Sequence, residues 1–155
     1  MERTFVLFKP DAVQRALLGD CVRRFEAKGL KLAACKMILL DDKLLDIHYA
    51  HHKGKGFFPR LKDFMKAGPS LATVWEGCEA VKVVRDLVGA TNGRNALPGT
   101  LRGDFSVSTQ SNLVHASDSV ENAEAEVKRF FKKEELFDWK RTGEEWLYAD
   151  DERKK

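Results

Sequence analysis

The sequence predicts an α+β sandwich in which helices pack over a small sheet. Short β-branched and aromatic runs alternate with segments whose apolar residues recur at helical spacing. Their order is strand, helix, strand, two helices, strand, helix, loop, strand, helix, which holds too few parallel strands for a doubly wound fold. The chain has 155 residues, 43% of them hydrophobic, which suffices for one full-sized core. We therefore expect a single domain over residues 1–155, with a short charged tail from about residue 149.

Two strands and a helix are expected in the first part of the chain. Residues 4–8 are β-branched and aromatic, and the Lys-Pro-Asp at 9–11 ends this opening strand. Apolar residues at helical spacing over 18–25, followed by Gly29, predict a helix. The run 30–40 predicts a second strand, but its two lysines break simple alternation. Either a bulge or a strand that is buried on both faces explains this break.

The middle of the chain predicts two helices and a third strand. An aspartate at 41–42 can cap a helix that carries apolar and aromatic residues over 44–52. Pro59 suits the first turn of a second, short helix, which Gly-Pro at 68–69 ends. Residues 71–75 are apolar and β-branched, and they predict the third strand.

The last third of the chain contains the longest predicted loop. Helical spacing over 80–88 precedes residues 90–104, which are rich in glycine and show no periodicity. A structureless connection of this length is usually functional. Residues 105–114 are expected to be partly strand, and apolar spacing over 120–131 predicts a final helix that starts near Ser119.

Charge and cysteine content restrict the class of protein. The chain has 27 basic and 24 acidic residues, and a formal charge of +3 is too small to indicate nucleic acid as the main partner. No apolar run reaches the ~18 residues of a membrane span, and the start has no signal-peptide pattern. A soluble, cytoplasmic protein without a membrane partner is expected. Its cysteines are then expected to be buried free thiols in a reducing compartment; they are Cys21, Cys35 and Cys78.

His115 is the main candidate for chemistry. Asp118 and Glu121 form a capping signal, so His115 lies at the junction of a strand and the final helix. Glu126 flanks the buried stripe of that helix, where a carboxylate can face inward and hold an imidazole in one tautomer. This arrangement suits a nucleophilic histidine. On spacing alone, a structural histidine remains the alternative.

Three cations could bind one polyphosphate. Arg85 flanks the buried face of its helix, Arg102 ends the glycine-rich loop, and Lys9 follows the first strand. Taken singly, each is an ordinary surface charge. Three further histidines share one helix and could approach a metal, although the segment resembles a solvated helix end; they are His48, His51 and His52.

Taken together, these features resemble the nucleoside diphosphate kinases over nearly the whole chain. The matching segments are ERTFVLFKPDAVQR, FFPRLKDFMKAGP, VWEG, PGTLRGDF and NLVHASDS. The resemblance implies a ferredoxin-like α+β sandwich with an antiparallel sheet. It also implies ping-pong transfer of the γ-phosphate from a nucleoside triphosphate to a nucleoside diphosphate, through a phosphohistidine at His115. The alternative is a catalytically silent regulatory protein of the same fold, which binds nucleotides or nucleic acid.

The resemblance assigns roles to matching positions. Glu126 and Ser117 would orient the imidazole of His115, and Tyr49 would lie beside it. The phosphates and ribose would be held by Lys9, Arg85, Thr91, Arg102 and Asn112. Phe57 would stack on the base, with Leu61 and Thr109 as walls. Lys9 would also take part in catalysis.

The resemblance implies further partners as well. Mg²⁺ would arrive with the nucleotide, ATP, GTP or another, rather than in a site formed by protein alone. Self-association is expected, as a hexamer by analogy with the C-terminal segment 137–148, with a tetramer as the alternative.

The chain also departs from the usual family pattern. Gly93 and Gly56 stand where proline is common, and Gln110-Ser111 replaces a glycine-arginine pair before Asn112. None of these changes removes a catalytic group. They bear on oligomer stability and nucleotide affinity.

Overall fold

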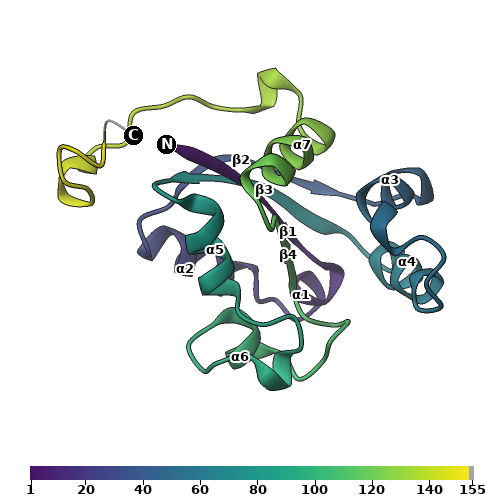
Figure 1. The fold of residues 1–155 in the computed structure, drawn as a ribbon. Coiled ribbons are helices and arrows are strands. Elements are labelled where there is room, and N and C mark those ends of the chain that lie inside the picture. Colours follow the sequence, from purple (N-terminus) through teal and green to yellow (C-terminus); the bar gives the residue numbers. More distant parts are fainter. Residues whose placement is uncertain (154–155) are drawn as a thin grey trace.

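A four-stranded antiparallel sheet forms the centre of the computed structural model, which describes residues 1–153 (Figure 1). Its strands are β1 (Glu2–Phe8), β2 (Lys31–Ile38), β3 (Ser70–Gly77) and β4 (Val114–Ala116). The strand order is β2-β3-β1-β4, and each neighbouring pair in this sheet is antiparallel. The α+β class and the small antiparallel sheet are therefore confirmed.

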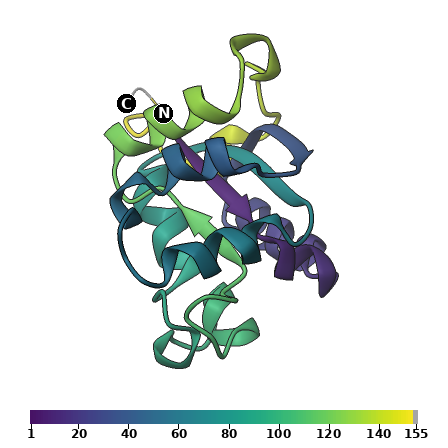
Figure 2. The same ribbon diagram turned by 90° about the vertical axis from the view of Figure 1, so that its right-hand side faces the viewer.

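Helices cover both faces of this sheet. They are α1 (Pro10–Gln14), α2 (Leu18–Ala27), α3 (Asp42–His48), α4 (Phe58–Lys66), α5 (Ala80–Val88), α6 (Leu101–Phe105) and α7 (Val120–Phe130). Within residues 1–153, four short 3₁₀ turns accompany them at Ala50–His52, Gly93–Asn95, Lys133–Glu135 and Glu144–Trp146. Figures 1 and 2 show α7 along the upper side of the sheet and α6 at the lower end of the molecule.

Side chains of β1 alternate between two hydrophobic cores. Phe5 and Leu7 enter the core beneath α3, α4 and α7, whereas Val6 and Phe8 enter the core beneath α2 and α5. All four side chains are fully buried. A central strand that is covered on both faces must be apolar throughout, which explains the unbroken apolar run of β1.

The expected irregularity in the second strand is a bulge. The pairing register of β2 with β3 shifts between Leu32 and Ala34. The extra residue moves the following side chains to the opposite parity, which accounts for the lysines on both parities. The expectation that all three cysteines are buried is wrong for Cys35. This residue lies just beyond the bulge on an edge strand and is exposed. Cys21 is buried as predicted, and Cys78 is partly buried.

Two expectations for residues 90–114 are wrong. The predicted structureless loop contains α6, whose N-cap Thr100 accepts a hydrogen bond from the backbone N–H of Gly103 at 3.0 Å. The predicted strand over 105–114 is limited to the start of β4. Serine side chains satisfy this backbone locally: Ser106 Oγ donates to the Ser111 carbonyl at 2.9 Å, and Ser108 Oγ accepts from the Ser111 N–H at 3.1 Å. Local bonds of this kind compete with a strand ladder.

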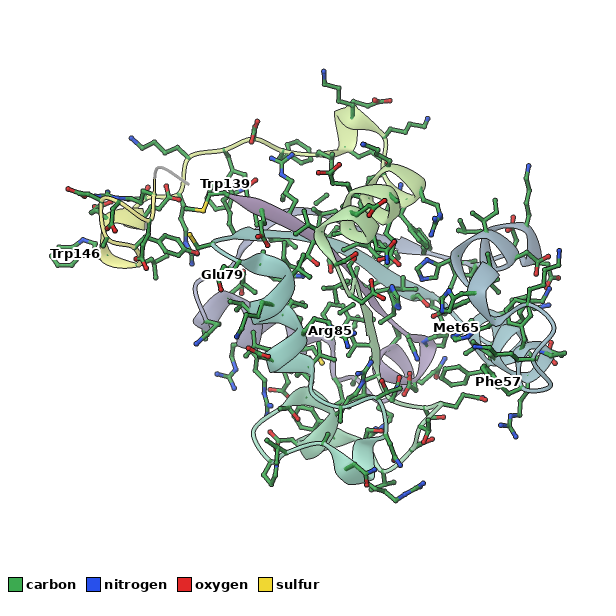
Figure 3. The ribbon with its side chains drawn as sticks, in the orientation of Figure 1. Phe57, Met65, Glu79, Arg85, Trp139 and Trp146 are labelled. Atoms are coloured by element: carbon green, nitrogen blue, oxygen red, sulfur yellow. The ribbon has the colours of Figure 1, made fainter. Side chains whose placement is uncertain are left out.

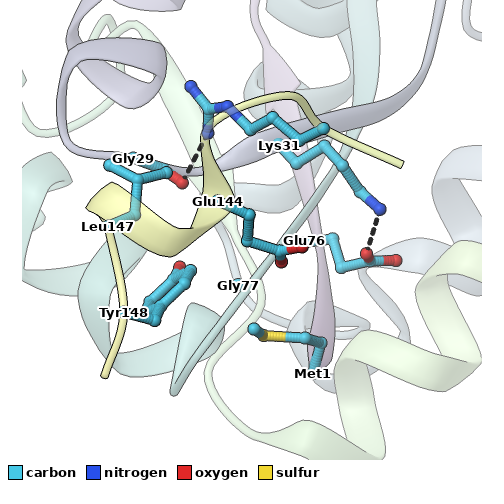
Figure 4. A pocket seen from close by; sticks show the side chains of 9 residues that line it. Met1, Gly29, Lys31, Glu76, Gly77, Glu144, Leu147 and Tyr148 are labelled. Carbon is cyan, nitrogen blue, oxygen red and sulfur yellow. Dashed lines mark hydrogen bonds and ion pairs between the residues drawn. The ribbon is translucent and has the colours of Figure 1, made fainter. Parts of the chain in front are cut away.

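The C-terminal segment 137–148 returns to the open edge of the sheet (Figure 4). Arg141 donates a hydrogen bond to the carbonyl of Gly29 at 2.8 Å. The hydroxyl of Tyr148 packs against Gly77, where an added Cβ would lie 3.0 Å from it. A larger residue at this position would have to displace the side chains of Tyr148 and Leu30. Of the expected charged tail from about residue 149, the last two residues lie outside the described part of the chain.

Candidate active site

A cleft of about 1400 Å³ lies between the α3–α4 side of the molecule, the segment 91–112, β4 and α7. It brings together nearly all the site residues predicted from sequence. Those that line it are Lys9, Tyr49, Phe57, Leu61, Arg85, Thr91, Arg102, Thr109, Asn112, His115 and Glu126. Ser117, the remaining one, is buried behind the cleft, where it contacts Glu126.

The His115 imidazole is held by a carboxylate. Its Nε2 lies 2.9 Å from Oε1 of Glu126, and the hydroxyl of Ser117 donates to Oε2 of the same carboxylate at 2.5 Å. An ionised carboxylate can only accept, so the proton of the neutral ring is on Nε2. The Nδ1 atom therefore keeps its lone pair. The ring is partly accessible, with 20% of its side-chain surface exposed, whereas Glu126 is buried.

The local backbone explains how β4 presents this histidine. Leu113, just before the strand, has a left-handed backbone with φ of 71°. Such a conformation is strained for a branched residue and persists only where its surroundings fix it. Here the N–H of Leu113 donates to the Asp11 carboxylate at 3.0 Å, and its carbonyl accepts from the N–H of Lys9 at 2.8 Å. The residues after β1 thus fix the entrance to β4.

Arg102 is buried and donates hydrogen bonds to backbone carbonyls near His115. It donates to the carbonyls of Asn112 at 3.2 Å, Val114 at 2.5 Å and Gly89 at 2.9 Å. A guanidinium has five N–H groups, so these three bonds leave two N–H groups free. Burial lowers the pKa of Arg102 to about 10, and the nearby charge of Arg85 adds to this effect. The side chain remains cationic at neutral pH.

Lys9 and Asn112 form a second buried contact in the cleft. The ammonium of Lys9 donates to Oδ1 of Asn112 at 2.6 Å. The amide of Asn112 donates to the carbonyls of Thr91 and Thr109, at 2.8 and 2.9 Å. Burial, together with the charge of Arg102, lowers the pKa of Lys9 to about 8. Asp11 lies near enough to raise the pKa of Lys9 slightly, but within residues 1–153 the ammonium of Lys9 forms no ion pair, so it is well suited to an anion.

Arg85 and Phe57 occupy the more open parts of the cleft. Figure 3 shows Arg85 on α5 near the middle of the molecule and Phe57 at the α4 end. Arg85 is exposed, although sequence spacing placed it beside a buried face. Phe57 is 42% exposed and packs edge-on against His52, with ring centroids 5.1 Å apart. An exposed aromatic ring beside a cleft can stack on a planar ligand.

His48 and Arg129 lie next to His115, which their sequence spacing did not show. The His48 ring is buried and meets the His115 ring nearly perpendicularly, with centroids 4.5 Å apart. Nη1 of Arg129 lies 3.2 Å from Nδ1 of His48. Burial holds the pKa of His48 far below its usual range, so the ring is neutral. The ring of Tyr49 also packs near His115, with ring centroids 6.0 Å apart. Burial raises the pKa of the Tyr49 phenol.

Among residues 1–153, one group has the spacing of a metal site, namely His48, His115 and Glu126. The guanidinium of Arg129 already occupies Nδ1 of His48. A cation placed there would face this arginine, which opposes metal binding. The trio His48, His51 and His52, whose spacing alone could have approached a metal, does not form such a group in this part of the chain.

Comparison with known proteins identifies the family of the chain. A model of the family "Nucleoside diphosphate kinase" matches residues 2–136. A curated relative of that name from Parabacteroides distasonis is 57% identical, over 98% of this chain and 99% of the relative. One from Saccharomyces cerevisiae is 53% identical over 95% and 96% of the two chains.

Solved structures point to the same family. The nucleoside diphosphate kinase from Halobacterium salinarum, solved in complex with CDP, superimposes with a TM-score of 0.93. It is 47% identical, and the match covers 96% of this chain and 99% of that one. A family protein from Babesia bovis gives a TM-score of 0.92 at 46% identity, with 96% and 100% coverage. The chain belongs to the nucleoside diphosphate kinase family.

Proposed function

We propose roles for individual residues in the reaction that this chain catalyses as a member of its family. That reaction moves the terminal phosphate of a nucleoside triphosphate to a nucleoside diphosphate through a phosphohistidine. One observation carries the assignment: Glu126 holds Nε2 of His115, so that Nδ1 is free in a cleft with buried cations. Nδ1 is therefore the proposed nucleophile.

The transfer itself requires little proton movement in this arrangement. Nδ1 of His115 bonds to the γ-phosphorus while the bond to the β–γ bridging oxygen breaks. The nucleoside diphosphate leaves with that electron pair. The ring becomes positively charged, and the carboxylate of Glu126 stabilises this charge through the Nε2 proton. A second nucleoside diphosphate reverses the same steps, which gives ping-pong kinetics.

Cations and donors of the cleft bind the phosphates in this proposal. Phosphoryl transfer has a loose transition state with charge on the equatorial oxygens, so positioning and cationic contacts provide most of the catalysis. Lys9, Arg85 and the two remaining N–H groups of Arg102 supply positive charge. Thr91 and Asn112 supply neutral donors to phosphate and ribose. Because Arg102 and Lys9 are already fixed by protein contacts, little reorganisation is needed when the phosphates bind.

Phe57, Leu61 and Thr109 form the base end of the cleft in this proposal. Phe57 is exposed to a ligand, whereas Leu61 is buried beneath it in the core. Stacking on an aromatic face does not depend on the hydrogen-bond pattern of a base. Broad acceptance of nucleoside diphosphates follows.

Mg²⁺ fits this cleft as a partner of the nucleotide. Among the described residues that line the cleft, the carboxylates are Asp118 and Glu126, and Glu126 is occupied by His115 and Ser117. One carboxylate together with substrate phosphates and water is a usual environment for Mg²⁺. Asp118 is thus the residue that would face the ion. The ion would neutralise charge on the phosphates during transfer.

Self-association and location follow from the family resemblance and from the surface. Several apolar side chains are largely exposed, and they are Leu39, Leu97, Val107 and Phe137. Burial of such residues stabilises oligomers, and we propose a hexamer, with a tetramer as the alternative. No helix within residues 1–153 is long and apolar enough to cross a membrane. We propose a cytoplasmic location on the basis of the free thiols.

Replacement of His115 tests the nucleophile directly. We expect wild-type protein incubated with γ-labelled ATP to carry an acid-labile, alkali-stable label. His115→Ala should lose both the label and nucleotide exchange, whereas His51→Ala, a control on an exposed histidine, should keep them. Label retained on the His115→Ala protein would contradict the proposal.

The orienting role of Glu126 predicts a separation of kinetic constants. In Glu126→Gln the amide keeps the shape of the side chain but removes the charge that stabilises the imidazolium. Loss of a charge-assisted hydrogen bond corresponds to a kcat reduced about tenfold to hundredfold. We expect KM to stay nearly constant, because the interaction forms in the transition state. Steady-state kinetics at saturating donor measure this, and an unchanged kcat would refute the role.

Lys9 predicts weaker nucleotide binding in alkaline solution. Since its pKa is lowered to about 8, Lys9 is cationic below that pH and becomes neutral above it. Nucleoside diphosphate affinity should therefore be full below this pH and fall up to about tenfold by about pH 9, below the range in which Arg102 would lose its charge. Calorimetric titration of His115→Ala protein measures binding without turnover. Lys9→Arg, which stays charged, should lose the pH dependence; the same fall in both proteins would exclude Lys9 as its cause.

A further inference from the structure

Two polar side chains meet at the base end of the cleft without an assigned role. Nε of Arg60, on α4, donates to Oε1 of Gln110 at 3.1 Å. The two residues are 50 positions apart in sequence and both line the cleft. Arg60 follows Phe57 by three residues, which places both on the same side of α4. Gln110 follows Thr109 directly. The pair therefore joins the two walls between which the proposed base site lies.

Gln110 is held in place by local structure. The N–H of Gln110 donates to Oγ of Ser108 at 3.2 Å, which closes a tight turn. The carbonyl of Gln110 lies 3.4 Å from the ammonium of Lys9. The position of Gln110 is thus coupled to the residues that bind phosphate.

The hydrogen bond decides which groups the pair can offer to a ligand. Arg60 occupies one lone pair of the Gln110 amide oxygen, and a guanidinium carries donors only. What remains is the NH₂ group of Gln110, the terminal N–H groups of Arg60 and one lone pair on Oε1 of Gln110. The pair therefore offers a base edge many more donors than acceptors. Guanine carries the acceptors O6 and N7 on one edge, whereas adenine has an amino donor in place of O6.

We propose that Arg60 and Gln110 form a base-recognition pair that donates hydrogen bonds to the edge of the bound base and favours guanine over adenine. The inference rests on the proposed function, because it uses Phe57 as the stacking platform. The pair modifies a site that otherwise stacks on any base. It acts on the binding of the base and leaves transfer to His115 unaltered.

Single-turnover phosphorylation of His115 with three donors tests this inference. The donors are GTP, ATP and ribose 5-triphosphate, which lacks a base, each below saturation. In Arg60→Ala and Gln110→Ala we expect the second-order rate constant with GTP to fall about two- to tenfold, the size of one or two exposed hydrogen bonds. The ATP value should change less, and the ribose triphosphate value should not change. Gln110→Ala keeps the carbonyl that Lys9 contacts.

The double variant and a surface control complete the experiment. Because the two side chains act as a unit, Arg60→Ala with Gln110→Ala should lose no more than either single variant. Arg23→Ala, an exposed arginine on α2 outside the cleft, should match wild type with all three donors. Equal losses with all donors, or an unchanged GTP rate, would overturn the inference. Failure of wild type to phosphorylate His115 with any donor would instead count against the proposed function.

Discussion

The hydrogen bond between Nε2 of His115 and the carboxylate of Glu126 is the contact on which the chemistry of the site depends. It joins β4 to α7, and it is reinforced by Ser117, which donates to the second carboxylate oxygen. Glu126 is buried, so a charge in this position without partners would cost several kcal/mol. The two hydrogen bonds compensate that cost. They also fix the tautomer of the imidazole and thereby select the nitrogen that can react.

The fold supports this contact from both sides. The core beneath α7 includes Phe5 of β1, whose ring stacks on Phe130 of α7 with centroids 4.4 Å apart. Ser119 caps α7 by accepting from the N–H of Asn122 at 3.1 Å. These contacts fix the position of α7 on the sheet, and therefore the position of Glu126. On the other side, Arg102 donates to the carbonyls of Asn112 and Val114, so a buried cation of the cleft also holds the backbone just before His115.

Much of this structure could be predicted from sequence, and the failures have physical causes. A continuous apolar run located β1, which is buried on both faces. Apolar periodicity located α2, α5 and α7, because each buries one regular face. It missed α6 and overextended the last strand, since serine and threonine side chains satisfy the backbone there. Spacing marked His115 and Glu126 as candidates but could not show that they touch.

The rest of the site depends on contacts between distant parts of the chain. His48 and Arg129 meet across 81 positions, and Arg60 and Gln110 across 50. No local pattern encodes such pairs. The resemblance to a family supplied the roles of Thr91, Thr109 and Asn112, which carry no signal of their own in the sequence. The clamp that Arg102 places on the backbone was visible only in three dimensions.

Identification of the histidine nitrogen that receives the phosphate tests the central claim most directly. Phosphorylated protein labelled with ¹⁵N in its histidines can be examined by NMR, where coupling to ³¹P identifies the bonded nitrogen. Because Glu126 holds Nε2 of His115, the account predicts a bond from phosphorus to Nδ1 of that residue. A phosphate on Nε2, or on another histidine, would contradict it.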